Sequence, residues 1–424
     1  MIALLGAAAP QLEVHSVSRG TEAVSAPVRV APVPIRPAAY ASSSMASGEI
    51  SRHLKGVLAK SGAGLISAAV DIQGTGSVLR LNPDQPTPPA STEKLYTALA
   101  LLNSVGPNVR LRTLVRVSGA VRPDVSGRIY LVGGGDPYLS GASLDALAVA
   151  VRAAGIRVIR GALVVDDLRY DSSHQAPGWK GTFVPEDLGP MSALAVDENG
   201  WRSDSSFVAD PGMANLRRFR DLLRKHGVRV SDAVVRGRAP SSTSVVTSHD
   251  SAPLSRLLQR MGKDSDNFTA EMLLKELGLR HRGAGTTASG ATSVRDVLRE
   301  QLGGIGTVVD GSGLSNSDRQ SAAGELSVLT VAEQGANASA FTAILPIACK
   351  DGTLVHRMCG TAAAGRVRAK TGTLPGVYSL SGYTTTADHH EVRFAFLLAQ
   401  APSSANARAA IDDCVVHLSS LRMS

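Results

Sequence analysis

The sequence contains few aromatic residues, few cysteines and no long hydrophobic run. Aromatic side chains make up 4% of its 424 residues, and the formal net charge of +8 comes without any dense basic run interleaved with aromatics. Nucleic-acid binding is therefore not expected, because it usually relies on such basic and aromatic surfaces. The excess positive charge is still compatible with contact to another anionic surface, such as a cell-wall polymer.

No transmembrane segment is predicted, because the apolar run at residues 2–9 is far too short to span a bilayer. This run lacks the basic residues that begin a signal peptide, but its last residues are small, as at the end of one. The stretch that follows is rich in Ala, Pro, Ser and Val and has almost no periodicity. We therefore expect residues 1–47 to be a disordered tether that carries the remnant of an export signal. A tail without function is the alternative.

The three cysteines, Cys349, Cys359 and Cys414, include no Cys-x-x-Cys pair and have no histidine cluster beside them. A zinc site is not expected from this pattern, and we predict no metal or other cofactor. In an exported protein one pair can form a disulfide, and Cys349 with Cys359 closes the shorter loop. Free buried cysteines are an equal alternative at this point.

A chain of 424 residues is long enough for two or three domains. Three short polar strings stand out in its sequence. They are Ser-Thr-Glu-Lys at residues 91–94, Ser-Asp-Asn at 265–267 and Lys-Thr-Gly at 370–372. Together they supply hydroxyl, ammonium and amide groups, which are the groups needed to acylate a serine without a histidine.

The first string is predicted to begin a helix. Two prolines precede Ser91, and apolar residues then recur at three- and four-residue spacing. Ser91 therefore falls in the first turn, and Lys94 lies on the same face. Of the nine lysines, only Lys94 has a serine three residues before it. A surface Ser and Lys without function would have the same local pattern.

The second string lies between two predicted helices. An apolar stripe at residues 254–261 ends near Gly262, and a second one runs from Phe268 to a predicted end at Gly278. We expect residues 265–267 to be a short connection in which polar side chains are held rigidly. Helix capping is the strong alternative, because Ser, Asp and Asn are common N-caps.

The third string lies on a predicted strand, because residues 366–371 alternate between basic and small or apolar side chains. Two more strands are expected at residues 377–385 and 391–399, followed by a helix at 405–421. Short connections between these strands predict an antiparallel meander with Lys370 at the wall of a cleft. Gly372, which lacks a Cβ, would let a ligand backbone approach. A solvent-facing basic strand is the alternative.

In this order, the three strings are the known signature of class A β-lactamases and penicillin-binding proteins. Further strings at residues 131–137, 310–315 and 365–374 extend the resemblance. From about residue 50 onward, the chain resembles the D-alanyl-D-alanine carboxypeptidase/endopeptidase family, the class C low-molecular-mass penicillin-binding proteins. These are serine acyltransferases related to the serine β-lactamases.

The resemblance implies an α/β (α+β) fold: a transpeptidase-like domain whose antiparallel sheet is flanked by helices and which is interrupted by an inserted α/β domain. Between Lys94 and Ser265 lie 170 residues, more than a compact β-lactamase places there. Strand-like runs at residues 111–119, 128–132 and 162–166 support the insertion. We therefore expect a catalytic domain of residues 48–106 plus 246–424 and an inserted domain of residues 107–245.

The resemblance also implies an activity, the cleavage of peptidoglycan stem peptides between their terminal D-alanines through an acyl-enzyme on Ser91, with β-lactam antibiotics as inhibitors. It implies an exported, extracytoplasmic protein, in a periplasm-like space or the cell wall, whose export signal is incomplete in this sequence. A neutral Lys94, its pKa lowered by burial and by the Lys370 charge, would take the Ser91 proton. The catalytic residues implied are Ser91, Lys94, Ser265 and Asn267, and the substrate-binding residues are Lys370, Thr371, Gly372 and Thr373.

More detailed roles follow from the same resemblance. Ser265 would relay the proton to the leaving amine, and Asn267 would bind the substrate amide and hold Lys94. Lys370 and Thr371 would bind the terminal carboxylate, and the backbone N–H groups of Ser91 and Thr373 would form an oxyanion hole. We assign no chemical role to Asp310 or Ser312, which a Gly-Ser-Gly turn explains structurally.

Two other functions stay open at this point. A serine β-lactamase shares the acylation step, but the Glu-x-x-Leu-Asn string of class A enzymes does not occur between Asn267 and Lys370. A non-catalytic cell-wall binding or scaffold protein has no need for both Ser91 and Lys94. The sequence does not separate carboxypeptidase from endopeptidase activity, and it leaves the oligomeric state open.

Overall fold

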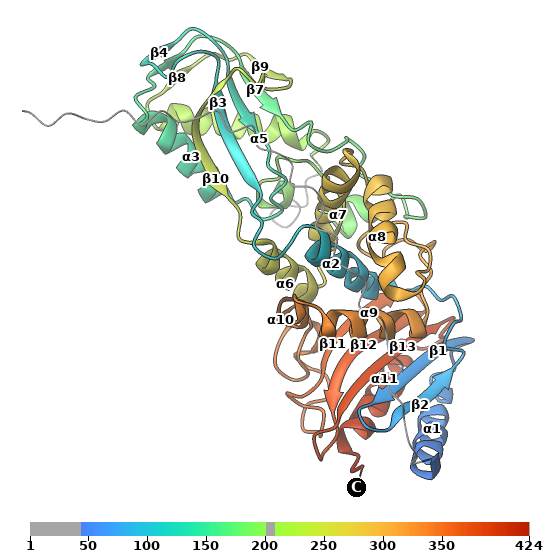
Figure 1. Ribbon diagram of the computed structural model, residues 1–424. Helices are drawn as coiled ribbons and strands as arrows, with labels where there is room; N and C mark the ends of the chain where they lie inside the picture. The colour runs from blue at the N-terminus through green and yellow to red at the C-terminus, as the bar shows by residue number, and fades with distance from the viewer. Residues whose placement is uncertain (1–43, 201–207, 424) are drawn as a thin grey trace, which may run out of the picture. The chain divides into compact units, whose positions relative to one another are not determined.

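The computed structural model describes residues 44–200 and 208–423. Its first sheet is antiparallel and joins both ends of the described chain, in the strand order β11-β12-β13-β1-β2 (Figure 1). Its strands are β1 (Leu65–Ile72), β2 (Gly76–Leu81), β11 (Arg368–Leu374), β12 (Val377–Thr385) and β13 (Glu391–Ala399). The meander predicted for the last three strands is confirmed.

Helices cover both faces of this sheet. Successive residues of β13 point to opposite faces, and at residues 394–397 both sets are apolar and buried. Phe394 and Phe396 pack in one core with α1 (Ser44–Ala59) and α11 (Ser404–Ser420). Ala395 and Leu397 belong to a second core, together with helices that lie between the first and last strands in sequence. These are α2 (Glu93–Ser104), α6 (Leu254–Asp264), α7 (Asn267–Arg282), α8 (Thr287–Leu302), α9 (Ala322–Gln334) and α10 (Ala338–Ala343).

The predicted helices are present, but their ends differ in places. Helix α6 runs past Gly262 to Asp264, and α7 runs past Gly278 to Arg282. Gly278 does not end α7 because it lies against α8, where a Cβ would be 2.6 Å from the Gly290 nitrogen. The helix ends instead at Gly283, whose φ of 76° gives the left-handed C-cap that glycine favours.

The segment between α2 and α6 forms a second, mixed sheet in the order β10-β3-β5-β7-β9, in which β5, β7 and β9 are parallel. Its strands are β3 (Arg112–Val117), β5 (Ile129–Val132), β7 (Leu163–Asp166), β9 (Val234–Arg236) and β10 (Ser244–Asp250). Helices α3 (Gly141–Ala153) and α5 (Pro211–Lys225) share its apolar core. This agrees with the expected strands at 111–119, 128–132 and 162–166.

Shorter elements complete this segment: β4 (Asp124–Val125), β6 (Val158–Ile159) and β8 (Arg229–Val230), which form a parallel three-stranded sheet, and α4 (Phe183–Glu186). Strand β10 spans the domain boundary expected at residue 246 and pairs along its length with β3. Residue 246 thus lies inside a strand and not in a connection. The domain limits of 48–106 plus 246–424 and 107–245 stay a prediction.

Helix α1 begins at Ser44, so residues 44–47 of the expected tether are helical. The rest of that tether, and with it the expected export signal, lies outside the described residues. Within the described ranges, no helix is both long and apolar enough to cross a membrane.

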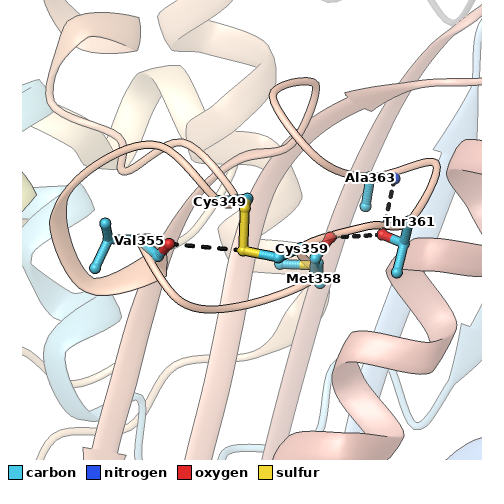
Figure 2. Close-up of a disulfide and its surroundings, with 6 residues drawn as sticks. All are labelled: Cys349, Val355, Met358, Cys359, Thr361 and Ala363. Atoms are coloured by element: carbon cyan, nitrogen blue, oxygen red, sulfur yellow. Dashed lines mark hydrogen bonds between the residues drawn. A yellow bond between two sulfur atoms is a disulfide. The ribbon is translucent and has the colours of Figure 1, made fainter.

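Cys349 and Cys359 form a disulfide with an S–S distance of 2.04 Å (Figure 2). Cys414, a residue of α11, is a free thiol buried in the core that this helix shares with α1. Of the two alternatives left open by the sequence, the structure has the disulfide that closes the shorter loop.

Candidate active site

The first string lies where the chain turns into α2. Ser91 sits in a 3-10 turn, Ala90–Thr92, that leads directly into the helix, rather than in the first α-helical turn. The Pro89 carbonyl tightens this turn by accepting from the nitrogen and the hydroxyl of Thr92, at 3.4 and 2.9 Å. Lys94 is fully buried, and its Nζ lies 3.1 Å from the partly exposed Ser91 Oγ. The expected pairing of hydroxyl and ammonium is present.

Two further acceptors fix the Lys94 amine. Its Nζ donates to Asn267 Oδ1 at 2.8 Å and to the Ser312 carbonyl at 2.6 Å. An ammonium has three hydrogens, and with Ser91 Oγ it finds three acceptors here. A neutral amine keeps two hydrogens for Asn267 and Ser312, so its lone pair is left facing the Ser91 hydroxyl.

Burial lowers the pKa of Lys94 from 10.5 to about 8, although nearby carboxylates, Asp310 and Glu271 first among them, oppose the shift. The pKa of Lys370 is lowered well below its ordinary value, by burial first and then by the Lys94 charge. The predicted lowering of the Lys94 pKa by burial is thus confirmed. The Lys370 charge, which we also expected to lower it, is not among the main causes, and the repulsion between the two ammonium groups lowers the pKa of Lys370 instead.

The second string is brought to the third. Ser265 occupies the left-handed C-cap of α6, with φ 57°, and its Oγ accepts from Lys370 Nζ at 2.8 Å. N-capping by a side chain accounts for only one residue of the string, Asp266, which accepts from the Thr269 nitrogen at 3.0 Å as the N-cap of α7. Asn267 begins α7 and faces Lys94 instead.

Strand β11 presents the third string, and Lys370 on it has no exposed surface. The alternative of a solvent-facing basic strand is therefore wrong for Lys370, although Arg368 on the same strand is exposed. A Cβ on Gly372 would lie 1.9 Å from Ser379 Oγ and 2.6 Å from the Pro89 carbonyl. The glycine thus lets β11 pack against the turn that carries Ser91, a protein contact at the place where we expected a ligand. Thr373 is exposed beside it.

Three groups at this site were not found from the sequence. Glu271 Oε1 accepts from the nitrogens of Gly311 and Ser312 at 2.9 and 2.8 Å, and Asp310 accepts from those of Gly313 and Ser315 at 2.6 and 2.7 Å. These bonds hold the loop whose Ser312 carbonyl binds Lys94. The third is Thr353, whose hydroxyl lies 2.8 Å from that of Thr371. Asp310 had a signal, a family string, whereas Glu271 and Thr353 had none.

Side chains that precede the second string also reach the site loops. Trp179 Nε1 donates to Asp310 Oδ2 at 2.6 Å, and the Tyr138 hydroxyl donates to Asp266 Oδ2 at 2.9 Å. The guanidinium of Arg260 lies 3.9 Å from the centre of the Tyr138 ring. The segment between α2 and α6 therefore helps to position two of the loops around Lys94.

Replacing Glu271 with leucine is expected to destabilise the fold by about 2–4 kcal/mol, because two buried N–H groups lose their acceptor. Burial raises the pKa of Glu271 to about 8, so glutamine closely resembles its protonated form. Glu271→Gln keeps an oxygen for both nitrogens and should lie within about 1 kcal/mol of the wild type. Urea unfolding of the three proteins measures this, and equal losses in both variants would contradict it.

Replacing Gly313 with alanine should disturb the turn that carries Ser91. A Cβ there would lie 1.8 Å from the Ala90 carbonyl oxygen, and φ is +79°. Gly283→Ala is a matched control, because its φ is +76° and nothing lies within 4 Å of its Cβ position. We expect about 1 kcal/mol of destabilisation for the control, and for Gly313→Ala a greater loss together with slower Ser91 acylation. Similar acylation rates in both variants would refute the clash.

Among residues 44–200 and 208–423, no group of three or more His, Cys, Asp or Glu side chains is arranged to hold a metal ion.

Known proteins are similar to this chain in sequence and in fold. The family model described as D-Ala-D-Ala carboxypeptidase 3 (S13) matches residues 49–207 and 201–420. The D-alanyl-D-alanine carboxypeptidase of Actinomadura sp. (strain R39) is 32% identical over 383 residues, which cover 70% of each chain. Carboxypeptidase DacB of Mycolicibacterium smegmatis is 31% identical over 376 residues, covering 81% of this chain and 78% of the relative.

Among solved structures, penicillin binding protein 4 (dacB) from Haemophilus influenzae has a TM-score of 0.77 at 21% identity and covers 87% of this chain and 99% of its own. That protein has also been solved in complex with a β-lactam. At this identity the likeness shows the fold, which is the mixed α and β architecture expected from the sequence.

Proposed function

This chain belongs to the D-Ala-D-Ala carboxypeptidase 3 (S13) family and is a serine-type peptidase, and we propose that Ser91 is its nucleophile. Its substrates are peptidoglycan stem peptides ending in D-Ala-D-Ala. One observation carries the proposal: Lys94 Nζ contacts Ser91 Oγ at 3.1 Å while two other acceptors take its remaining hydrogens. That arrangement prepares an amine base for a serine hydroxyl.

Acylation uses the first two strings. The neutral Lys94 amine takes the Ser91 proton as Oγ forms a bond to the carbonyl carbon between the two D-alanines. The C–N bond then breaks, and the proton passes to the leaving amine, with Ser265 as the relay. Free D-alanine departs, and water hydrolyses the acyl-enzyme to return Ser91 to its hydroxyl form. Asn267 holds Lys94 and also bonds the substrate amide.

Carboxylate binding falls to the third string. The Lys370 ammonium, held by Ser265 Oγ and the Thr371 carbonyl at 2.8 and 2.9 Å, attracts the terminal carboxylate, and the Thr371 hydroxyl donates to it. The backbone N–H groups of Ser91 and Thr373 stabilise the oxyanion. Gly372 contributes by letting β11 approach Pro89.

The same acyl-enzyme serves carboxypeptidase and endopeptidase reactions, which differ in the group on the leaving side. β-Lactams acylate Ser91 as substrate analogues and inhibit the enzyme. We place the protein outside the cytoplasm, in a periplasm-like space or the cell wall. Its substrate is found there, and the Cys349–Cys359 disulfide suits an oxidising compartment.

The test combines mass spectrometry of the penicillin adduct with digestion of defined muropeptides. We expect an adduct on the peptide that contains Ser91 and release of D-alanine from a pentapeptide, and cleavage of a cross-linked dimer reports endopeptidase activity. Absence of both the adduct and all cleavage products would overturn the proposal. Rapid turnover of nitrocefin, with no lasting adduct, would favour a β-lactamase.

A further inference from the structure

The disulfide-closed loop, residues 349–359, contacts the candidate active site at its tip. Within it, the 3-10 turn Gly352–Leu354 exposes Thr353, whose Oγ1 lies 2.8 Å from Thr371 Oγ1. Thr371 belongs to the string to which we assigned the substrate carboxylate. An exposed hydroxyl at this distance is accessible to the same ligand.

The loop is tied to the elements that carry the second and third strings. Both carboxylate oxygens of Asp351 bind Lys263 Nζ at 2.7 Å, two residues before Ser265. Gly352 packs against the same place, since a Cβ on it would lie 2.6 Å from the Lys263 carbonyl. On the other side, Ala348 donates to the Val367 carbonyl at 3.0 Å, immediately before β11.

Two bonds within the loop, one covalent and one a backbone hydrogen bond, limit where Thr353 can move. The Cys349–Cys359 bond closes the loop (Figure 2), and the Cys349 nitrogen donates to the Leu354 carbonyl at 2.9 Å. Leu354, next to Thr353, has no exposed surface and anchors the turn in the core. The hydroxyl of Thr353 is therefore held in place without being buried.

A pair of hydroxyls can bind an anion better than one. In the Thr353–Thr371 pair one O–H is used within the pair, and the other stays available to donate. The internal bond polarises the free O–H and strengthens its bond to a carboxylate. Lys370 supplies the charge close by, since its Nζ binds the Thr371 carbonyl at 2.9 Å.

We propose that Thr353 is a further residue of the carboxylate site: its hydroxyl donates to Thr371 Oγ1, and so orients and polarises the Thr371 hydroxyl that receives the terminal carboxylate of the substrate. The Cys349–Cys359 disulfide fixes the loop that presents it. This inference rests on the proposed function, because it assumes that Thr371 faces the carboxylate.

The experiment compares Ser91 acylation by benzylpenicillin, which carries a carboxylate, and by its methyl ester, which does not. Thr353→Val should lower the second-order rate constant for benzylpenicillin by about three- to tenfold and leave that for the ester within about twofold. Thr353→Ser should restore the wild-type rates. Thr361→Val is the control, since the Thr361 hydroxyl bonds only locally, to the Met358 carbonyl at 2.7 Å and the Ala363 nitrogen at 3.2 Å (Figure 2).

A second comparison tests the disulfide. Removing it with Cys349→Ser and Cys359→Ser should also reduce the preference for benzylpenicillin over the ester, but not further when Thr353→Val is already present. An unchanged preference in Thr353→Val, or additive losses in the combined variant, would overturn the inference. If wild-type protein forms no penicillin adduct and releases no D-alanine, the proposed function itself fails, which is a distinct result.

Discussion

Ser91→Ala is expected to reduce D-alanine release by at least about 10³-fold and to abolish the covalent penicillin adduct. The variant removes the proposed nucleophile and leaves its surroundings in place. Lys94 keeps its bonds to Asn267 and the Ser312 carbonyl, so its amine stays positioned. Chromatography measures the release of D-alanine from a pentapeptide, and intact-protein mass spectrometry measures the penicillin adduct.

The matched control is Ser104→Ala, at the C-terminal end of α2, the helix that follows the Ser91 turn. The Ser104 hydroxyl donates to the Ala100 carbonyl at 2.7 Å, far along α2 from the reaction. It should retain wild-type rates, and the thermal unfolding midpoint of Ser91→Ala should stay within a few degrees of the wild type. D-alanine release by Ser91→Ala at a rate near that of Ser104→Ala would show that another residue is the nucleophile.

Much of the fold could be predicted because its patterns are local. Alternating residues and short connections predicted β11, β12 and β13, and the two prolines before Ser91 predicted the start of α2. Boundaries were less accurate, because tertiary contacts determine them. Gly278 is a residue type that often ends a helix, yet α7 continues through it because the missing Cβ lets α8 approach.

The site was predicted in part for the same reason. Order and spacing indicated which strings meet, but no local pattern indicates which atom pairs form. Ser265 accepts from Lys370 rather than from Lys94, and this follows only from the left-handed turn at the end of α6. Glu271 and Thr353 are an ordinary helical carboxylate and an ordinary loop hydroxyl in sequence, and only tertiary packing brings them to the strings.

Lys94→Met is expected to slow penicillin acylation by about 10²–10⁴-fold, the usual contribution of a general base. Methionine has a similar length but no amine, so it fills the buried site without accepting a proton. Lys225→Met is the control, because Lys225 is an exposed residue of α5 that pairs with Asp145 at 3.3 Å. Stopped-flow or rapid-quench mass spectrometry gives the rates, and comparable rates in both variants would exclude Lys94 as the base.

The wild-type pH profile tests the same role without any substitution. Because the base must be neutral and burial brings the pKa of Lys94 to about 8, the acylation rate should rise with pH and level off above about 8. Below that pH it should fall about tenfold per unit, following the neutral fraction. The rate is measured at saturating penicillin, since the pKa of Lys370 is also lowered and a bound carboxylate favours its charged form. A rate that stays constant between pH 6 and 9 would mean that Lys94 does not accept the proton, whereas a rise that disappears in Lys94→Met assigns the titration to this amine.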